Sequence, residues 1–325
     1  MPNDNIQNDK SKISFTIVTP VFNRANCIRR CIESVIAQNY ADLEHWIVDD
    51  GSTDNTFEIV QEYASAHSWI KCHKYEKNRG VNAARNYGIQ SASNNYILFL
   101  DSDDYLVDNA LYGIKESIYS NPGYLHYLFA QDDRMPFYNQ NPLLNQKDQV
   151  ELNFSIFLAG QVHLDFVHVM ASGLVKEFPF DESLRIYESL NFFRIYKKGE
   201  RQLFTKKVVS MIERGRADSV TNEGRLTNGK ALKKQYTYLR QKLFLFEKDY
   251  LQHQAKKAMA DAIIRAFVLG TAVGEYEDNK ILIDLAQKYN VHIPYKYRLI
   301  SALRFGFLIR YAIFSYSRIK RIFKL

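Results

Sequence analysis

The sequence predicts an α/β protein with a mostly parallel central sheet, flanking helices and a helical C-terminal extension. Between residues 13 and 104, apolar β-branched runs alternate with segments of helical periodicity, as in parallel strands joined by crossover helices. Residues 230–270 carry a helical pattern throughout. A hydrophobic content of 46% and a charged content of 24% are those of a folded globular chain, and 325 residues suffice for a substantial core.

Strand and helix patterns alternate regularly only in the first part of the chain. The predicted strands cover residues 13–22, 43–52, 70–76 and 96–104, and the predicted helices cover residues 26–38, 56–67 and 80–92. Ser52, Thr53 or Asp54 has a side chain suited to capping the second helix.

Beyond residue 104 the pattern weakens. Residues 121–160 contain three prolines and are predicted to be irregular. A helix is expected near residues 186–198, and a charged, glycine-rich loop over residues 214–229.

The net charge of +7 comes from the end of the chain. Residues 295–325 contain eight basic residues and no acidic ones, whereas the rest carries 35 basic and 36 acidic residues. This distribution argues against a nucleic-acid-binding protein. The first twelve residues lack the apolar region of a signal peptide, and no apolar run of eighteen residues occurs, so we expect neither a secretory signal nor a spanning helix.

The three cysteines do not suggest a disulfide framework or a zinc site. Cys27 and Cys31 lie four residues apart on one face of a predicted helix, and no histidine stands beside them at metal-ligand spacing. We interpret these two residues and Cys72 as reduced thiols of an intracellular protein.

Three carboxylates, Asp101, Asp103 and Asp104, directly follow a buried-strand pattern. Like charges this close together repel one another and resist desolvation, so they either stay in water on a loop or hold a metal ion. Since parallel strands end at one edge of a sheet, Asn23, the Asp49–Asp50 pair and this acidic cluster are expected to lie together, where α/β proteins bind ligands.

The sequence resembles the family 2 inverting glycosyltransferases in four ordered blocks, "TIVTPVFNRANC", "IVDDGSTDNT", "KNRGVNAARN" and "FLDSDD". The likeness covers about residues 13–110 and extends more loosely to about residue 215. It implies the GT-A fold, in which a Rossmann-like nucleotide-binding half is joined to an acceptor-binding half. It also implies a nucleotide-sugar donor, commonly a UDP-sugar, and Mn²⁺ or Mg²⁺.

The resemblance divides the chain into four predicted parts. These are a disordered N-terminal segment (1–12), a nucleotide-sugar-binding half (13–110), an acceptor-binding half (111–225) and a helical region (226–325) whose basic, aromatic tail is residues 295–325.

The segment Asp101-Ser102-Asp103 matches the DXD motif of this family. By resemblance Asp103 is the direct metal ligand, Asp101 lies near the ribose or the metal, and Asp104 supports them. Asp101 and Asp103 stand at alternate positions, which is expected to place both side chains on one side of an extended segment. A divalent cation neutralises the diphosphate leaving group, and Mg²⁺ or Mn²⁺ prefers few protein oxygens plus phosphates and water.

Further positions match the nucleotide pocket of the family. They are Pro20, Phe22, Asn23, Asp49, Asp50, Arg79 and Arg85. Asp50 matches the residue that binds the uracil base, while Asp49 either contributes or braces the loop. Phe22 either flanks the base or packs in the core, and Arg79 and Arg85 are either near the nucleotide or surface cations.

An inverting transfer also needs a base that takes the proton of the acceptor hydroxyl. The family often supplies it from an acidic pair, which is incomplete here because a serine follows Glu188 in "FPFDESLRIYESLNFF". We expect Glu188 to be the base, with Asp181 and Glu182 as alternatives and a helix-cap role as the structural explanation. His163 and His168 lie where the acceptor subsite begins, but we assign them no chemistry.

These patterns together indicate a metal-dependent inverting glycosyltransferase of cell-surface polysaccharide or glycolipid synthesis, with a saccharide or lipid-linked saccharide acceptor. We expect a cytoplasmic protein, peripheral at the inner face of the membrane through residues 295–325; the same tail could instead pack on the catalytic domain or form a dimer contact. A sugar-1-phosphate nucleotidyltransferase is disfavoured, because such an enzyme needs a glycine-rich phosphate loop soon after the first strand. The segment "TPVFNRANC", which ends the first strand here, contains no glycine. A non-catalytic sugar-nucleotide-binding or assembly subunit at the membrane is the alternative that the incomplete acidic pair favours.

Overall fold

The computed structural model describes residues 13–184, 187–212 and 229–323, so the predicted disordered segment and nearly all of the predicted charged loop lie outside the described residues. The chain forms two compact units. The first unit comprises Met1–Phe157 and Gln161–Arg214, and the second comprises Leu158–Gly160 and Gly215–Leu325.

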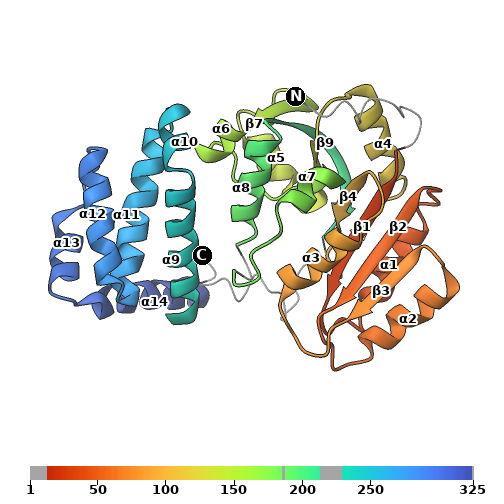
Figure 1. Ribbon diagram of the computed structural model, residues 1–325, viewed down its shortest axis with the longest axis horizontal. Coiled ribbons are helices and arrows are strands. Elements are labelled where there is room, and N and C mark those ends of the chain that lie inside the picture. The colour runs from red at the N-terminus through yellow and green to blue at the C-terminus, as the bar shows by residue number, and fades with distance from the viewer. Residues whose placement is uncertain (1–12, 185–186, 213–228, 324–325) are drawn as a thin grey trace. The chain divides into compact units, whose positions relative to one another are not determined.

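One sheet runs through the first unit (Figure 1). Its order is β3-β2-β1-β4-β8-β6-β9-β5, with β7 paired to β9, which makes nine strands among the described residues. The strands are β1 (Phe15–Val21), β2 (Leu43–Asp49), β3 (Ile70–Lys74), β4 (Tyr96–Phe99), β5 (Tyr105–Leu106), β6 (His126–Gln131), β7 (Gln149–Asn153), β8 (Val167–Ala171) and β9 (Arg201–Met211). The sheet spans both predicted halves, and the predicted division at residue 110 stays a prediction.

The α/β class is confirmed, but the sheet is mixed. The first four strands in space, β3-β2-β1-β4, are parallel, as the alternating pattern predicted. Beyond them β8 runs antiparallel to both β4 and β6, so among the described residues four strand pairs are parallel and four are antiparallel. The expectation of a mostly parallel sheet rested on residues before 104, which contribute only the parallel part.

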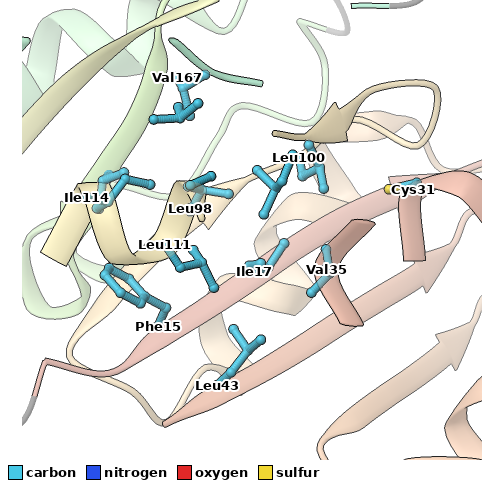
Figure 2. Close-up of a cluster of buried hydrophobic side chains, with 14 of the residues drawn as sticks. Phe15, Ile17, Cys31, Val35, Leu43, Leu98, Leu100, Leu111, Ile114 and Val167 are labelled. Carbon is cyan, nitrogen blue, oxygen red and sulfur yellow. The ribbon is translucent and has the colours of Figure 1, made fainter. Parts of the chain in front are cut away.

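Helices cover both faces of the sheet. They are α1 (Ile28–Ile36), α2 (Thr56–Ala66), α3 (Val81–Ser91), α4 (Ala110–Ser120), α5 (Met135–Gln140), α6 (Phe154–Leu158), α7 (Ser172–Glu177) and α8 (Ser189–Lys198). Strand β1 shows how the two faces are filled: Phe15 and Ile17 pack with residues of α1, α2 and α4, whereas Val18 packs with residues of α3, α7 and α8. Figure 2 shows Leu98 and Leu111 in the first of these two clusters.

The prediction that residues 121–160 are irregular is wrong. This segment contains β6, β7, α5 and α6. The side chains of residues 127–130 are fully buried in β6. The prolines that suggested irregular structure lie outside the strands, where a missing backbone N–H costs no ladder hydrogen bond.

The second unit is helical, as predicted. Its helices are α9 (Gly229–Leu245), α10 (Glu247–Gln252), α11 (Lys256–Val273), α12 (Tyr276–Lys288), α13 (Tyr295–Ala302) and α14 (Gly306–Phe323). Helix α11 contacts α9, α12, α13 and α14 and is the centre of the unit. Gly306 lies so close to the carbonyl of Thr271 that a Cβ there would be 1.9 Å from the oxygen, so α14 can approach α11 only through glycine. Within the part of the chain that the structure describes, every helix is too short or too polar to cross a bilayer.

His45 is a titratable side chain in the core of the first unit. It is fully buried in β2, its Nε2 lies 2.8 Å from Thr19 Oγ1, and burial lowers its pKa to about 3. Because the folded-state pKa is depressed, the unfolded chain takes up a proton below about pH 6.5 that the folded chain refuses, and stability is lost as pH falls from there towards 3.

We therefore expect the pH dependence of stability to become shallower in His45→Gln, whose amide can still bond to Thr19. Between pH 6 and pH 5, the free energy of unfolding should fall less steeply than in the wild type by about 1.4 kcal/mol per pH unit. Urea unfolding followed by tryptophan fluorescence measures this, because Trp46 and Trp69 both lie in the first unit. The difference in the free energy of unfolding between the variant and the wild type at pH 7.5 serves as the control for altered packing. An unchanged slope of the free energy of unfolding against pH would contradict the prediction.

Candidate active site

Polar loops meet at one edge of the sheet. The carboxyl ends of β1, β2 and β4 lie side by side, because β1 pairs in parallel with both of the others. Asn23, Asp50 and Asp101 follow these three strands in the sequence. The predicted grouping of the three polar clusters at this edge is therefore confirmed.

The loop after β1 is fastened to the loop after β2. Asn23 has a left-handed backbone (φ 52°), its N–H donates to Ser52 Oγ at 2.9 Å, and its Oδ1 accepts the N–H of Thr53 at 2.9 Å. The expectation that Ser52 or Thr53 caps α2 is wrong, because tertiary contacts with Asn23 engage these groups instead. Asp54 does accept the N–H of Thr56 at 3.1 Å at the start of α2, as predicted.

Asp49 braces the second loop from inside the protein. Its side chain is fully buried, its Oδ1 accepts the N–H of Ser52 at 2.6 Å, and burial raises its pKa. Gly51 follows with φ 79°, and a Cβ there would lie 2.8 Å from the backbone carbon of Lys77. Only glycine fits this turn without strain. The bracing alternative for Asp49 thus has a structural basis, and its donor contact stays a prediction.

Asp50 holds the N-terminus of α3. Its Oδ1 accepts the N–H of Arg79 at 2.7 Å and its Oδ2 accepts the N–H of Gly80 at 2.8 Å. Gly80 is the N-cap residue of α3 with φ 101°, and Asp50 is 3% exposed. A carboxylate at this position satisfies backbone donors and suits the positive end of the helix dipole. Its predicted contact with the uracil base stays a prediction alongside this structural role.

Side chains on one face of α3 form hydrogen bonds with the segment that precedes α8. Asn82 Nδ2 donates to the carbonyls of Asp181 and Leu184 at 2.8 and 3.0 Å. Asn86 donates to the carbonyl of Phe180 at 2.9 Å and accepts the Phe180 N–H at 2.8 Å. The sequence analysis missed both asparagines, although their spacing of four residues places them on one helix face.

Arg85, on the same face, joins two predicted site residues. Its Nη2 donates to Asp101 Oδ1 at 2.9 Å, and its Nη1 donates to Glu188 Oε1 at 2.9 Å. Burial by itself would lower the pKa of Arg85, but the charges of Asp101 and Glu188 outweigh it and raise the pKa. Arg85 is therefore no surface cation: only 13% of its side chain is exposed.

The DXD segment forms a turn rather than the predicted extended segment. Strand β4 ends at Phe99, and the N–H of Asp104 donates to the carbonyl of Asp101 at 2.9 Å. Asp and Ser favour turns because their short polar side chains bond to nearby backbone, which ends the strand earlier than its apolar run suggested. Asp101 is exposed, Ser102 is buried and Asp103 is half-buried.

Side chains of α1 and its N-cap hold the backbone of this turn. The thiols of Cys27 and Cys31 donate to the carbonyls of Ser102 and Asp101 at 3.6 and 3.7 Å, and Arg30 donates to the carbonyl of Asp103 at 3.1 Å. Cys27 and Cys31 are thiols with buried side chains. Their role as braces of the turn was missed, since only the fold places α1 beside it.

The donor set of the turn fits a hard divalent cation that is shared with a ligand. Within residues 13–184, 187–212 and 229–323, no three His, Cys, Asp or Glu side chains are arranged to hold a metal by themselves. Mg²⁺ and Mn²⁺ usually bind one or two carboxylates together with substrate phosphates and water. Asp101 and Asp103 could supply the carboxylates, and this metal role stays a prediction.

Asp181 and Glu182, the alternative candidates for the base, both have partners for their carboxylates. Asp181 Oδ1 accepts the N–H of Ser183 at 2.8 Å, and Glu182 pairs with Arg79 at 3.1 Å. Glu188 also has a partner. It is the N-cap residue of α8, but its side chain makes no capping hydrogen bond and instead pairs with Arg85 at 2.9 Å, which links it to the DXD turn.

The two histidines differ in exposure. His163 is exposed, whereas His168 stacks on Phe192 at 4.0 Å and lies 2.9 Å from His126. Burial lowers the pKa of His168 to about 3 and lowers that of His126. The imidazoles of His126 and His168 stack on the rings of Tyr196 and Phe192. Pro20 is buried in β1 and Phe22 is half-buried, and their nucleotide contacts, like that of Arg79, stay predictions.

Replacing Asp50 by Asn tests its structural role without any ligand. The variant loses one of the two charge-assisted acceptors at the start of α3, so its free energy of unfolding should fall by about 2 kcal/mol. Asp108→Asn, at an exposed position, should change it by less than about 0.5 kcal/mol. Urea unfolding followed by tryptophan fluorescence gives both values, and equal stabilities would show that the cap contributes nothing.

The first unit is similar in sequence to known glycosyltransferases. Residues 16–158 match the family Glycosyl transferase family 2. "Glycosyltransferase GlyA" of Streptococcus pneumoniae is 30% identical over 208 residues, which are 61% of this chain and 28% of GlyA. A GalNAc(5)-diNAcBac-PP-undecaprenol beta-1,3-glucosyltransferase of Campylobacter jejuni is 28% identical over 211 residues, which are 63% of this chain and 66% of that protein. The chain thus spans less than a third of the GlyA length.

Solved structures share the fold over nearly the whole chain. S. aureus TarS 1–349 has a TM-score of 0.60 at 18% identity, covering 96% of this chain and 92% of that chain. The mannosyltransferase PcManGT from Pyrobaculum calidifontis has a TM-score of 0.56 at 17% identity, covering 94% of this chain and 88% of that chain. With the match of residues 16–158 to this family, these similarities show that the chain has the GT-A fold.

Proposed function

We propose that the chain is a metal-dependent inverting glycosyltransferase that moves a sugar from a UDP-sugar to a hydroxyl of a saccharide or lipid-linked saccharide. The observation that carries the proposal is the meeting of Asp101 and Glu188 at Arg85. Asp101, which we assign to the leaving-group site, and Glu188, which we assign as the base, share one guanidinium beside the carboxyl ends of the parallel strands, and this supports the proposal.

The names of similar proteins support the donor and the acceptor. A TarS structure holds UDP-GlcNAc, and the PcManGT structure holds GDP-Man with Mn²⁺. The Campylobacter relative is named for an undecaprenol-linked acceptor. We therefore propose a UDP-sugar as the first donor to test and a lipid-linked saccharide of cell-surface polysaccharide or glycolipid synthesis as the first acceptor.

In the proposed reaction, the Glu188 carboxylate takes the proton of the acceptor hydroxyl while the hydroxyl oxygen attacks C1 of the donor sugar. A new C1–O bond forms on the face opposite the leaving group. The old C1–O bond breaks, its electron pair leaves on the nucleoside diphosphate, and the configuration at C1 is inverted. Mn²⁺ or Mg²⁺ bound at Asp101 and Asp103 would neutralise the charge on the diphosphate.

A non-catalytic sugar-nucleotide-binding subunit is the second candidate. It is favoured by the serine after Glu188, which leaves the acidic pair of the family incomplete. Binding of a sugar nucleotide without turnover would distinguish this candidate from the transferase.

A nucleotide-release assay with UDP-, GDP- and dTDP-sugars tests the proposal. With Mn²⁺ or Mg²⁺ and a membrane-lipid extract, we expect release from one donor, abolished by chelation. Asp103→Ala and Glu188→Ala should each lower the rate by about 10²–10⁴-fold, because one loses a charge at the leaving group and the other loses the base. Asp108→Ala is the control. Full activity in Glu188→Ala would move the base to Asp181, and tight binding without release would favour the non-catalytic subunit.

We also propose that the tail binds the membrane surface from the side of the cytoplasm. Among the described residues, seven of the thirteen exposed large hydrophobic side chains lie on α13, α14 and their connection. This tail patch consists of Tyr295, Leu299, Leu303, Phe305, Phe307, Leu308 and Tyr311. Exposed cations, Lys296, Arg298 and Arg304, lie in the same stretch, which contains no acid. Aromatic and basic side chains together suit the surface of an anionic bilayer.

Replacing three of these aromatics tests membrane binding without removing a helix. Tyr295, Phe307 and Tyr311 are 71%, 59% and 74% exposed, so the triple change to Ser should fold normally. It should weaken cosedimentation with phosphatidylglycerol-containing vesicles at least about tenfold, because apolar area no longer enters the interface. Tyr119→Ser, at a 71% exposed position of α4, is the matched control. Equal sedimentation of the wild type and the triple variant would contradict this proposal, as would membrane retention after deletion of residues 295–325.

A further inference from the structure

The side chain of Arg85 is mostly buried. Its side chain is 13% exposed, compared with 49% for Arg29, which pairs with Glu62 on the surface. The guanidinium carbon lies 5.8 Å from the ring centre of Phe99 and 5.9 Å from that of Phe180. Removing a cation from water is costly, and the two carboxylates compensate for that cost here.

The two carboxylates reach Arg85 from separate parts of the fold. Asp101 begins the turn after β4, and Glu188, 103 residues from Arg85, precedes α8. The Arg85 fork spans them with two hydrogen bonds of 2.9 Å. A planar fork fixes the separation and orientation of its partners, whereas the ammonium of a lysine is a point charge on a flexible stem.

Helix α3, which carries Arg85, is held by hydrogen bonds at its N-terminus and along one face. Its N-terminus is bonded to Asp50, and Asn82 and Asn86 bond the backbone of the segment before Glu188. Arg85 therefore projects from a helix that is held at its N-terminus and along one face. The Glu188 side chain is 25% exposed and has its Oε1 on Arg85.

We propose that Arg85 is a positioning residue for transfer: its fork sets Glu188 against the DXD turn so that the carboxylate meets the acceptor hydroxyl beside the bound donor. This inference rests on the proposed function. It assigns Arg85 to the orientation of the base, not to the affinity for the nucleotide. A base misplaced by about 1 Å can lose about 10²-fold in rate.

A double-mutant cycle on full-length protein tests the assignment. Arg85→Lys keeps the charge but loses the fork, so we expect kcat for transfer to fall about 100-fold. The Kd for the donor, measured calorimetrically with Mn²⁺, should change less than about threefold. Because Arg85 acts through Glu188, the double variant Arg85→Lys/Glu188→Gln should be no slower than Glu188→Gln alone. Arg29→Lys is the matched control and should keep wild-type kcat.

Two results would overturn the inference while the proposed function stands. One is a donor Kd that rises as much as kcat/KM falls, which would make Arg85 a donor contact. The other is a double variant in which the two losses multiply. If Arg85→Lys does not fold, as judged by circular dichroism, Glu188→Asp replaces it: the shorter carboxylate should lower kcat at an unchanged donor Kd, and an unchanged kcat would overturn the inference. A wild-type protein that binds the donor but never transfers overturns both proposals.

Discussion

Arg85 brings a positive charge into the first unit where the parallel strands adjoin β8, and a carboxylate lies on either side of it. Without Arg85, Asp101 and Glu188 would be two like charges with no cation between them. With it, both carboxylates have a shared cationic partner, which also lies close to the rings of Phe99 and Phe180. The cost of burying the Arg85 charge is offset only when the geometry is good, and the two 2.9 Å contacts meet that requirement. The shape of the site thus depends on this shared guanidinium.

The position of the guanidinium depends in turn on α3. Asp50 accepts the backbone N–H groups of Arg79 and of Gly80, the N-cap residue, and Gly80 allows the chain to turn sharply into the helix. Asp50 is itself placed by β2, whose parallel pairing with β1 sets the edge of the sheet. A carboxylate that the family resemblance assigns to the nucleotide therefore also anchors the helix that carries Arg85. The proposed donor site and the proposed base share one framework of hydrogen bonds, and we expect a change at Asp50 to affect both.

The second unit is organised by polar contacts inside a helical core. Asn279 donates to the hydroxyls of Thr271 and Ser301, and the guanidinium of Arg310 donates to the carbonyl of Ala272 near the end of α11, at 2.9 and 2.7 Å. These bonds fix α13 and α14 against α11. The aromatic side chains left outside this packing are those of the tail patch. Ile309, in contrast, is 7% exposed, so α14 buries one side chain of a turn while Phe307, Leu308 and Tyr311 face outward.

The sequence by itself determined the parallel strands of the first unit, the helical second unit and the edge at which the site lies, because apolar periodicity and the polar ends of strands are local signals. Its motif order also indicated the family whose model matches residues 16–158. Only the tertiary structure decided that β8 runs antiparallel to β4 and that residues 101–104 form a turn. It also decided that residues 126–131 form a buried strand between two prolines. It also decided the partners of Arg85, Asp50 and the two buried thiols. These depend on contacts between residues 16 to 103 positions apart, and no local pattern encodes which distant backbone a side chain will meet.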